Sequence, residues 1–432
     1  DSVMEALGMD DDVIDTSVTP NRGDMFSMNG NAHEIAAILD QKANFEVLKV
    51  QDEQKSADTL ADQIKVEIDE QDVAPVYKLM AIENVKIAPS PFWLQTTLMK
   101  AGIRPINNVV DVTNYIMLKY GQPLHAYDLD QLKGQTISVA PAGENVKFTT
   151  LDDEKRDLRP EDLVITADGT PIAMAGVMGG MATEVSDQTQ NIVIEAAIFD
   201  PIKVRKTARY HNLHSEAAMR FERGIDYSSL DDALNEAASL VADFGQGKVM
   251  SGVVVGNDTK LNPESITIAL ARINKILGTS LTSEEVVAIF DRLGFSTELD
   301  ATKQTFKVTV PVRRWDIHIE ADLLEEVARI FGYDNLPVTL PTGDPTIGQL
   351  TTEQKLMRAS RTVMEVLWLT QAMSYVLTTI AKSQQFVKGD HELVKVDWPM
   401  TKDREALRMN LISGLLDDIA YNKARSVENV AL

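Results

Sequence analysis

The stretch that decides the fold of the central region is RPINNVVDVTNY at residues 104–115, followed by GQPLHAYDLD at residues 121–130. The first part predicts a helix over residues 109–118. Both parts place Asn, Thr, His and Arg beside apolar residues, and such groups can hold the ammonium of an amino acid and the ribose of its ester. They can equally be structural, with Asn107 and Asn108 capping the helix and His125 at the top of a turn.

Strand-like and helical segments alternate around this stretch. Apolar runs rich in β-branched residues predict four strands, at residues 136–140, 146–150, 163–166 and 192–198. Residues 228–244 have apolar side chains at helical spacing and predict an amphipathic helix. Pro91 is placed to begin a further helix that Gly102 can end. The mixture predicts an α/β domain that reaches to about residue 255.

The flanking regions differ in composition from this domain. Residues 25–40 predict a helix, and the polar residues 41–62 are typical of a linker. A smaller unit over residues 262–338 has the order strand, helix, helix, strand, helix, and a linker rich in proline and glycine follows it. Residues 430–432 look like the beginning of a strand, which suggests a cut inside a domain. No internal repeat is visible.

Length and composition limit the possible classes of protein. The 432 residues suggest about three domains, and the 44% hydrophobic content allows each to bury a core. The chain has no cysteine, no apolar run near the roughly 20 residues of a membrane span and no secretory leader, and it begins at Asp1 rather than Met. We therefore expect an intracellular protein without disulfides or thiolate metal sites.

The net charge of −23 argues against a general nucleic-acid binder, because a diffuse acidic surface repels phosphate. One local exception is basic and lies close to two histidines. It consists of Lys203, Arg205, Lys206 and Arg209, near His211 and His214. This segment is either a solvated helix face or a phosphate contact.

Two further features allow a binding site. The glycine-rich exit Ala175-Gly176-Val177-Met178-Gly179-Gly180 permits a ligand to approach the backbone, although a tight turn has the same composition. Glu195 follows the apolar run Ile192-Val193-Ile194 and is either an edge residue or a carboxylate aimed into a pocket. No pair of nucleophile and base stands out, and neither an HExxH motif nor a P-loop occurs.

A group of carboxylates lies near residue 320. On a helix, Asp322, Glu325 and Glu326 occupy positions i, i+3 and i+4 on one face, and Asp316 can fold back from just before it. Carboxylates without cysteine or paired histidine suit a hard cation, Mg²⁺ or Ca²⁺. Alternatively, the helix dipole favours acidic residues in the first turn without any metal.

Several of these motifs, taken in order, resemble the β subunit of bacterial phenylalanyl-tRNA synthetase. Its editing domain is resembled by RPINNVVDVTNY and GQPLHAYDLD, by GVMGG and EVSD at 176–187, by EAAIFDP at 195–201 and by SEAAMRFERGID at 215–226. The next domain of that subunit is resembled by PVRRWDIHIEADLLEEVARIFGYDNLP at 311–337. TPNRGDMFSMNGNAHEIAAIL at 19–39 resembles the segment after its N-terminal tRNA-binding module. The resemblance covers nearly the whole chain.

The resemblance implies a multidomain α/β and α+β architecture. It implies an N-terminal segment and linker at 1–60, a mixed-sheet editing domain at 61–258, a small winged-helix-like α+β domain at 259–340 and part of a class II synthetase-like antiparallel α+β domain at 341–432. The N-terminal oligonucleotide-binding and C-terminal anticodon-binding modules of the family are expected to be missing.

The resemblance also implies a function. A cytoplasmic phenylalanine--tRNA ligase attaches phenylalanine to tRNA(Phe) with ATP and Mg²⁺, in an α₂β₂ assembly whose α subunit carries the aminoacylation centre. The β subunit would hydrolyse mischarged Tyr-tRNA(Phe) and act as a scaffold for the α subunit. The alternatives are a free-standing deacylase, for which a chain ending near residue 255 would be expected, and a scaffold without chemistry, for which a closed pocket would be expected.

The resemblance implies site residues by position in this sequence. The expected editing residues converge on one cleft: Arg104, Thr113, Asn114, His125, Glu195, Ser215 and Ala217. Glu195 would accept a hydrogen bond from the tyrosine phenol, and His125 would place a water near the ester. The expected Mg²⁺ ligands are Asp316, Asp322, Glu325 and Glu326.

Overall fold

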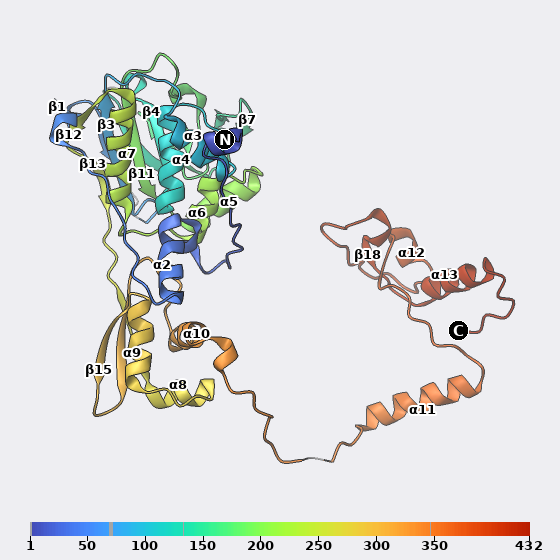
Figure 1. Ribbon diagram of the computed structural model, residues 1–432. Helices are drawn as coiled ribbons and strands as arrows, with labels where there is room; N and C mark the ends of the chain where they lie inside the picture. The colour runs from blue at the N-terminus through green and yellow to red at the C-terminus, as the bar shows by residue number, and fades with distance from the viewer. Residues whose placement is uncertain (1, 69–71, 133, 346) are drawn as a thin grey trace. The chain divides into compact units, whose positions relative to one another are not determined.

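The computed structural model describes residues 2–68, 72–132, 134–345 and 347–432 (Figure 1). The chain divides into two compact units, Asp1–Val338 and Thr339–Leu432. In the part of the chain that the structure describes, no helix is both long enough and apolar enough to cross a membrane. The architecture mixes helices with several sheets, which agrees with the expected combination of α/β and α+β elements.

Two buried antiparallel strands form the centre of the larger sheet of the first unit. They are β3 (Val76–Glu83) and β11 (Ile192–Ile198), and all of β11 is buried. The sheet has six strands in the order β1-β12-β3-β11-β4, with β13 also paired to β3. The other strands are β1 (Lys55–Thr59), β4 (Leu124–Asp128), β12 (Lys248–Ser251) and β13 (Val254–Asp258).

Helices cover one face of this sheet (Figure 1). They are α3 (Phe92–Lys100), α4 (Asn108–Tyr120) and α7 (Leu230–Gly245). The side chain of Asn107 caps α4 by accepting hydrogen bonds from the backbone N–H groups of Val109 and Val110. Lys119 and the Tyr120 hydroxyl both donate at 2.6 Å to the buried Glu236, which fixes α4 against α7.

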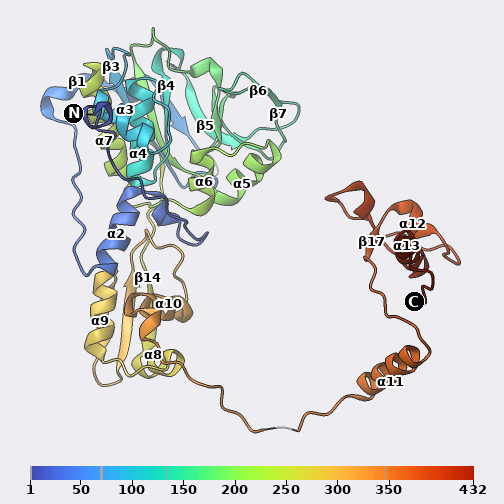
Figure 2. The same cartoon turned by 45° about the vertical axis from the view of Figure 1, so that its right-hand side comes forward.

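A second sheet has the order β10-β9-β8-β5-β2. Its strands are β2 (Lys65–Glu67), β5 (Thr136–Pro141), β8 (Leu163–Ala167), β9 (Thr170–Met174) and β10 (Met178–Gly179). The short hairpin of β6 (Lys147–Thr149) and β7 (Lys155–Asp157) lies beside it, with α5 (Pro201–Tyr210) and α6 (Glu216–Arg223) close by (Figure 2). The two helices follow β11 and pack against each other.

The C-terminal part of the first unit has its own small core. Three antiparallel strands in the order β14-β16-β15 pack against helices around Phe290, Phe295 and Phe306. The elements are β14 (Glu264–Ala269), α8 (Leu270–Leu277), α9 (Ser283–Arg292), β15 (Ser296–Asp300), β16 (Thr305–Val310) and α10 (Glu320–Phe331). Helix α2 (Met28–Ile38) joins this core through Ala37.

A buried arginine organises the segment that begins α2. Arg22 donates two hydrogen bonds of 3.0 Å to the carboxylate of Asp24 and one of 2.8 Å to Glu34. We call Arg22, Asp24 and Glu34 the first arginine clasp. Because one guanidinium neutralises two carboxylates from opposite ends of the segment, the clasp fixes how the chain enters α2.

The same arrangement recurs before α10. Arg314 donates two hydrogen bonds of 2.8 and 2.9 Å to Asp316 and one of 2.8 Å to Glu326. In both cases the aspartate follows the arginine by two residues and the glutamate by twelve. We call Arg314, Asp316 and Glu326 the second arginine clasp. This repeat is not apparent from the sequence, because from the arginine to the glutamate the two segments share no other residue at equivalent positions.

Arg329 joins the two clasps. It donates to Glu326 at 2.7 Å and also to Glu34, so the carboxylates of both clasps share it. Arg313 lies 3.8 Å from Asp24 and adds a second contact between the segments. These buried charges therefore connect α2 to α10 across nearly 300 residues of sequence.

The second unit has little apolar core of its own. It contains α11 (Thr352–Val366), β17 (Leu377–Thr378), α12 (Ile380–Gln384), β18 (Ala406–Leu407) and α13 (Ile412–Lys423). Ala406 is the only buried apolar residue among those described in this unit, and α11 buries none of its side chains. Such exposure of large apolar side chains is typical of a surface that another part of a protein covers.

Two expectations about individual elements are wrong. The presumed linker at 41–62 contains β1, whose strand pairs in parallel with β12 and so extends the larger sheet. Residues 430–432 form no strand, although Ala431 accepts a hydrogen bond from the backbone of Thr370. Strand β3 is a further element that was not among the predicted strands, although its residues are almost all buried.

The second arginine clasp generates a stability prediction. Replacing Arg314 by Ala leaves the part-buried Asp316 without its guanidinium partner and Glu326 with Arg329 alone, and we expect the free energy of unfolding to fall by about 3–5 kcal/mol. The measurement is urea unfolding followed by circular dichroism. Arg272→Ala is the matched control, because its ion pair with Glu320 is exposed and is worth at most about 1 kcal/mol. Equal losses in both variants would contradict a stabilising role for the clasp.

Candidate functional site

A pocket of about 100 Å³ lies between the six-stranded and the five-stranded sheet of the first unit. Its walls come from β4 and β11 on one side, from β8, β9 and the glycine-rich turn on the other, and from α6. The lining residues are Pro123, Leu124, His125, Tyr127, Ile165, Ala173, Met174, Gly176, Val177, Met178, Gly179, Glu195, Phe199, Ala217 and Phe221. The pocket is therefore mostly apolar, with one carboxylate and one imidazole as its chemically reactive groups.

Strand register explains why the reactive groups meet. Glu195 of β11 is paired with His125 of β4, so their side chains lie next to each other on the same face. Tyr127 is paired with Val193 and Tyr77 with Ala197, which are the positions two residues to either side of Glu195. Because side chains alternate between faces, both tyrosines share the face of Glu195.

Glu195 is buried and held by these two tyrosines. The hydroxyls of Tyr77 and Tyr127 donate to Oε2 at 2.7 and 2.8 Å. Among the residues that the structure describes, none donates a hydrogen bond to the other oxygen, Oε1. Glu195 thus lines the pocket with one oxygen fixed and one able to accept a further hydrogen bond.

Burial changes the protonation of the site. It raises the pKa of Glu195 to about 7, although the hydrogen bonds from Tyr77 and Tyr127 act in the opposite direction. Burial also raises the pKa of both tyrosine hydroxyls well above the usual value, with the charge of Glu195 adding to it. Burial lowers the pKa of His125 to about 4. The imidazole is therefore neutral at pH 7 and can accept a proton or a hydrogen bond.

The glycine-rich turn makes room for the histidine. A Cβ atom on Gly179 would lie 2.5 Å from Cε1 and 2.7 Å from Nε2 of His125, which is too close for any side chain. The ring of His125 also packs edge-on against Tyr127, with centroids 4.5 Å apart. Gly179 and Tyr127 together fix where the imidazole lies.

Helix α6 supplies the remaining wall. Ala217 and Phe221 line the pocket, and the small side chain of Ala217 leaves space beside Glu195. Ser215 caps α6 by accepting a hydrogen bond from the backbone of Ala218, and its hydroxyl donates to the carbonyl of Val177 at 2.8 Å. Ser215 therefore holds α6 to the glycine-rich turn and does not itself line the pocket.

The structure brings together only part of the expected editing set. His125, Glu195 and Ala217 line the pocket, whereas Arg104, Thr113 and Asn114 do not. Arg104 is exposed, and the hydroxyl of Thr113 on α4 donates to the backbone carbonyl of Val110. The expected convergence of all seven side chains is thus not seen in this arrangement, and the roles of these three residues stay predictions.

Tyr77 and Tyr127 were missed by sequence reasoning. Tyr127 follows His125 by two residues in a strand, and that alternation was a usable signal that both lie on one face. Tyr77 carried no comparable signal, because it is 118 residues from Glu195 in the sequence.

The expected Mg²⁺ ligands do not form a metal site as they are placed here. Asp316 and Glu326 are held by Arg314, and Asp322 accepts hydrogen bonds from the backbone N–H groups of His318 and Ile319. Burial would raise the pKa of Glu326, but the hydrogen bonds and charges of Arg314 and Arg329 outweigh it and lower the pKa to about 2.

Glu325 is exposed and completes the set. No group of three or more His, Cys, Asp or Glu side chains able to hold a metal occurs within the described ranges. The arginines already neutralise the carboxylates that a divalent cation would need, so this arrangement does not fit Mg²⁺. The assignment stays a prediction that would require the second arginine clasp to open.

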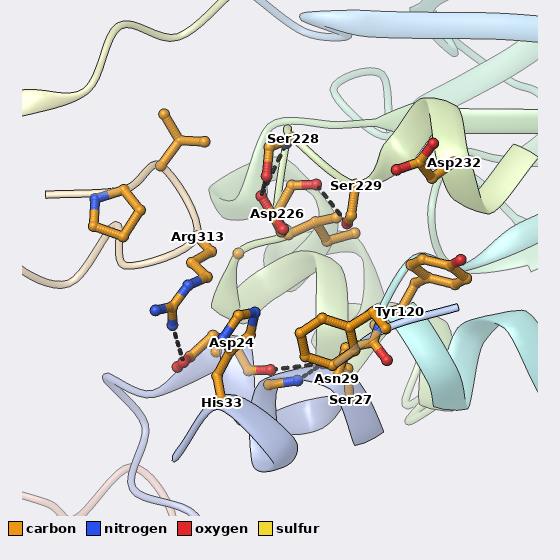
Figure 3. Close-up of a pocket in the computed structure, with 18 of the residues that line it drawn as sticks. Asp24, Ser27, Asn29, His33, Tyr120, Asp226, Ser228, Ser229, Asp232 and Arg313 are labelled. Carbon is orange, nitrogen blue, oxygen red and sulfur yellow. Dashed lines mark hydrogen bonds and ion pairs between the residues drawn. The ribbon is translucent and has the colours of Figure 1, made fainter. Parts of the chain in front are cut away.

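A larger cavity of about 470 Å³ lies between α2, the start of α7 and the loop before α10 (Figure 3). Figure 3 shows Arg313 directed toward Asp24, and Ser228 donates a hydrogen bond of 2.6 Å to Asp226. Arg313 also donates to the backbone carbonyl of Leu293. These polar groups already form hydrogen bonds or ion pairs with protein atoms, so we assign no substrate to this cavity.

Comparisons with known proteins match three consecutive stretches of this chain to known domain families. Residues 73–246, which contain the whole small pocket, match the B3/4 domain. Residues 266–333 match the tRNA synthetase B5 domain, and residues 336–432 match the phenylalanyl tRNA synthetase beta chain CLM domain. The three matches do not overlap and follow one another along the chain.

Relatives of high identity align with the whole chain. The chain is 55% identical to the phenylalanine--tRNA ligase beta subunit of Lactiplantibacillus plantarum, 49% to that of Latilactobacillus sakei and 48% to that of Streptococcus pneumoniae R6. Each alignment covers 100% of this chain and 53% of the relative, so the chain spans about half the length of these proteins.

A solved N-terminal fragment of the phenylalanyl-tRNA synthetase beta subunit from Pyrococcus horikoshii is 18% identical over 73% of this chain and 86% of that fragment. Its TM-score of 0.37 is too low to support an argument about fold. The identity over the full chain and the three consecutive domain matches are sufficient without it. This chain belongs to the phenylalanine--tRNA ligase beta subunit family.

Proposed function

We propose that this chain is part of a phenylalanine--tRNA ligase and hydrolyses Tyr-tRNA(Phe) in the pocket of His125, Glu195 and Ala217. The single observation that carries the proposal is the placement of Glu195. It is a buried carboxylate beside a histidine, with one oxygen fixed by two tyrosines and the other able to receive a hydrogen bond.

The need for such a site follows from the chemistry of the two amino acids. Tyrosine differs from phenylalanine by one hydroxyl, and an apolar synthetic pocket rejects an added hydroxyl by only about 10²-fold. A second site that requires this hydroxyl reverses the preference. With phenylalanine in the pocket, Oε1 of Glu195 would lose both water and the phenol, which costs about 1–3 kcal/mol or more.

The residues support hydrolysis by a positioned water. The oxygen of water bonds to the ester carbonyl carbon, the bond from that carbon to the 3′-terminal ribose oxygen breaks, and that oxygen gains a proton. The neutral imidazole of His125 would accept the hydrogen bond of the attacking water. Hydrolysis of an activated ester requires no protein nucleophile if the water is held in place, so we assign none.

Neighbouring residues support these two groups. Gly179 leaves space for the ring of His125, and Ser215 ties α6 to the turn that carries Gly179. Ala217 would admit the aromatic ring of the substrate. In this account Thr113 and Asn114 would approach the polar end of the amino acid only after tRNA binds, and Arg104 would face the tRNA.

Assembly and aminoacylation are also proposals for this chain. We infer that the α subunit carries the ATP-dependent reaction with phenylalanine and that the two subunits form an α₂β₂ heterotetramer in the cytoplasm. The exposed apolar side chains of the second unit support a covered surface in that assembly. Size analysis of co-expressed full-length chains should give a heterotetramer, and a stable β monomer beside free α would oppose this.

His125 and Glu195 generate a kinetic prediction. In the assembled enzyme, His125→Ala and Glu195→Ala should each slow the deacylation of Tyr-tRNA(Phe) by about 10²-fold or more, because water placement or phenol recognition is lost. Charging with phenylalanine should remain close to wild type. His391→Ala and Glu144→Ala are matched controls outside the pocket. Unchanged deacylation in both pocket variants would place the active centre elsewhere.

The raised pKa of Glu195 predicts a pH dependence. The carboxylate is the stronger acceptor for a phenol, so the preference for tyrosyl over phenylalanyl esters should fall as the pH decreases through about 7. Glu195→Gln should abolish this dependence.

The contribution of Glu195 to folding stability should depend on pH in the opposite direction, increasing as the pH decreases. Because the folded-state pKa lies above the ordinary value, this contribution to stability is fully present in acid and is lost as the pH rises through about 7. Thermal unfolding of wild type and Glu195→Gln across this range tests the second point. Parallel pH profiles for the two proteins would contradict it.

The metal assignment generates a separate prediction. We expect this chain alone to show no saturable Mn²⁺ binding, because Arg314 occupies Asp316 and Glu326. Electron paramagnetic resonance of free Mn²⁺ during titration measures this. In crystals of the assembled enzyme soaked with Mn²⁺, anomalous signal within bonding reach of Glu325 and Glu326 would confirm the assignment, and its absence would refute it.

A further inference from the structure

Helix α5 is a basic element on an acidic chain. The whole chain has 65 acidic and 42 basic residues, yet α5 contains no acidic residue. Its buried face consists of Val204, Thr207 and Ala208. Its exposed positions include Arg205, Lys206, Arg209 and Tyr210. The positive charges therefore gather on the solvent side of one helix.

Three of these cations have no acidic partner. Within the described part of the chain, no carboxylate lies within ion-pair distance of Arg205, Lys206 or Arg209. This sets them apart from Arg159, which pairs with Asp162 at 2.6 Å, and from the clasp arginines. Arg205 and Arg209 are one helical turn apart, with Cβ atoms about 6 Å from each other. Three unpaired cations on one face form a strip suited to successive phosphates.

An aromatic ring continues the strip. Tyr210 is 61% exposed, and the guanidinium of Arg159 lies 4.3 Å from its ring centroid. Arg159 is held in place by Asp162, so it fixes the ring without covering most of it. Exposed aromatic rings beside cations stack on unpaired bases in proteins that bind single strands.

The strip lies next to the pocket along the chain. Phe199, two residues before α5, lines the pocket, and so does Ala217 in the first turn of α6. Helices α5 and α6 pack against each other, and Figure 2 shows them side by side. The eight steps along the chain from Arg209 to Ala217 span at most about 29 Å. A few nucleotides can bridge that length.

We propose that Arg205, Lys206, Arg209 and Tyr210 form a binding strip for the single-stranded 3′ end of the tRNA, which delivers its terminal ester to the pocket of His125 and Glu195. The cations would contact phosphates, and the tyrosine would stack on a base. That the RNA leads into the pocket rests on the proposed function. That the strip binds RNA at all rests on the charge and exposure of its residues.

The neighbouring acidic residues pair with other arginines and do not neutralise the cations of the strip. Glu161 lies 3.3 Å from Arg159, and Asp152 lies 2.6 Å from Arg156 in the adjacent hairpin. An acidic protein partner would also meet these cations, but it would not require the aromatic ring beside them. The juxtaposition of unpaired cations, an aromatic ring and a pocket favours RNA.

The test uses the assembled enzyme with Arg205, Lys206 and Arg209 all replaced by Gln. The ratio of kcat/KM for Tyr-tRNA(Phe) to kcat/KM for the small ester 3′-O-tyrosyl-adenosine should fall at least tenfold, through KM for the tRNA. The dependence of log(kcat/KM) on log salt should become shallower by about 2, as expected for three lost phosphate contacts to a single strand. Tyr210→Ala should also raise the KM for Tyr-tRNA(Phe), whereas Tyr210→Phe, which keeps the aromatic ring, should have the KM of the wild type.

The control variant replaces Lys42, Lys65 and Lys86 by Gln. These exposed lysines also have no ion pair within the described residues, so the variant changes the net charge equally. An equal loss in this control, or no loss in the α5 variant, would overturn the proposal. If the wild type hydrolyses neither ester, the proposed function fails, and anisotropy of a labelled tRNA 3′-end oligonucleotide still decides whether α5 binds it.

Discussion

The structure of the pocket depends on the buried carboxylate of Glu195, to which strands of the central sheet supply hydrogen bonds. An ionised side chain inside a protein is unfavourable unless hydrogen bonds replace water. The antiparallel register of β3, β11 and β4 supplies them, because it places Tyr77 and Tyr127 on either side of Glu195. The same register brings His125 next to it. In the proposed function, phenol recognition and water placement would therefore both follow from one strand alignment.

The arginine clasps have a different task. Each neutralises an aspartate before a helix and a glutamate within it, in α2 and in α10, and Arg329 connects the two glutamates. Carboxylates that resemble a metal site in sequence are consequently engaged by guanidinium groups. A buried ion pair is weak evidence for stability, but removing one partner leaves an uncompensated charge. The clasps thus determine whether the carboxylates near α10 are available to a cation.

Much of the fold could be predicted from local pattern, and the rest required tertiary pairing. The apolar run at Ile192–Ile198 forms β11 with the expected bounds, and Asn107 caps α4 as its sequence position suggests. Tyr77 could not be placed, since its partner is 118 residues away. The carboxylates expected on a helix near residue 320 do lie on one, α10, but Glu326 is buried there and Glu325 is exposed. Spacing alone could not show that Arg314 and Arg329 both bind the carboxylate of Glu326.

The central claim is that Glu195 reads the tyrosine hydroxyl while His125 faces the scissile ester. A crystal structure of the assembled enzyme with 3′-tyrosylamido-3′-deoxyadenosine, an uncleavable analogue, tests this most directly. The account predicts the phenol oxygen within hydrogen-bond distance of Oε1 of Glu195 and the amide beside the imidazole of His125. An analogue bound in another cavity, or bound here with its phenol directed away from Glu195, would contradict it.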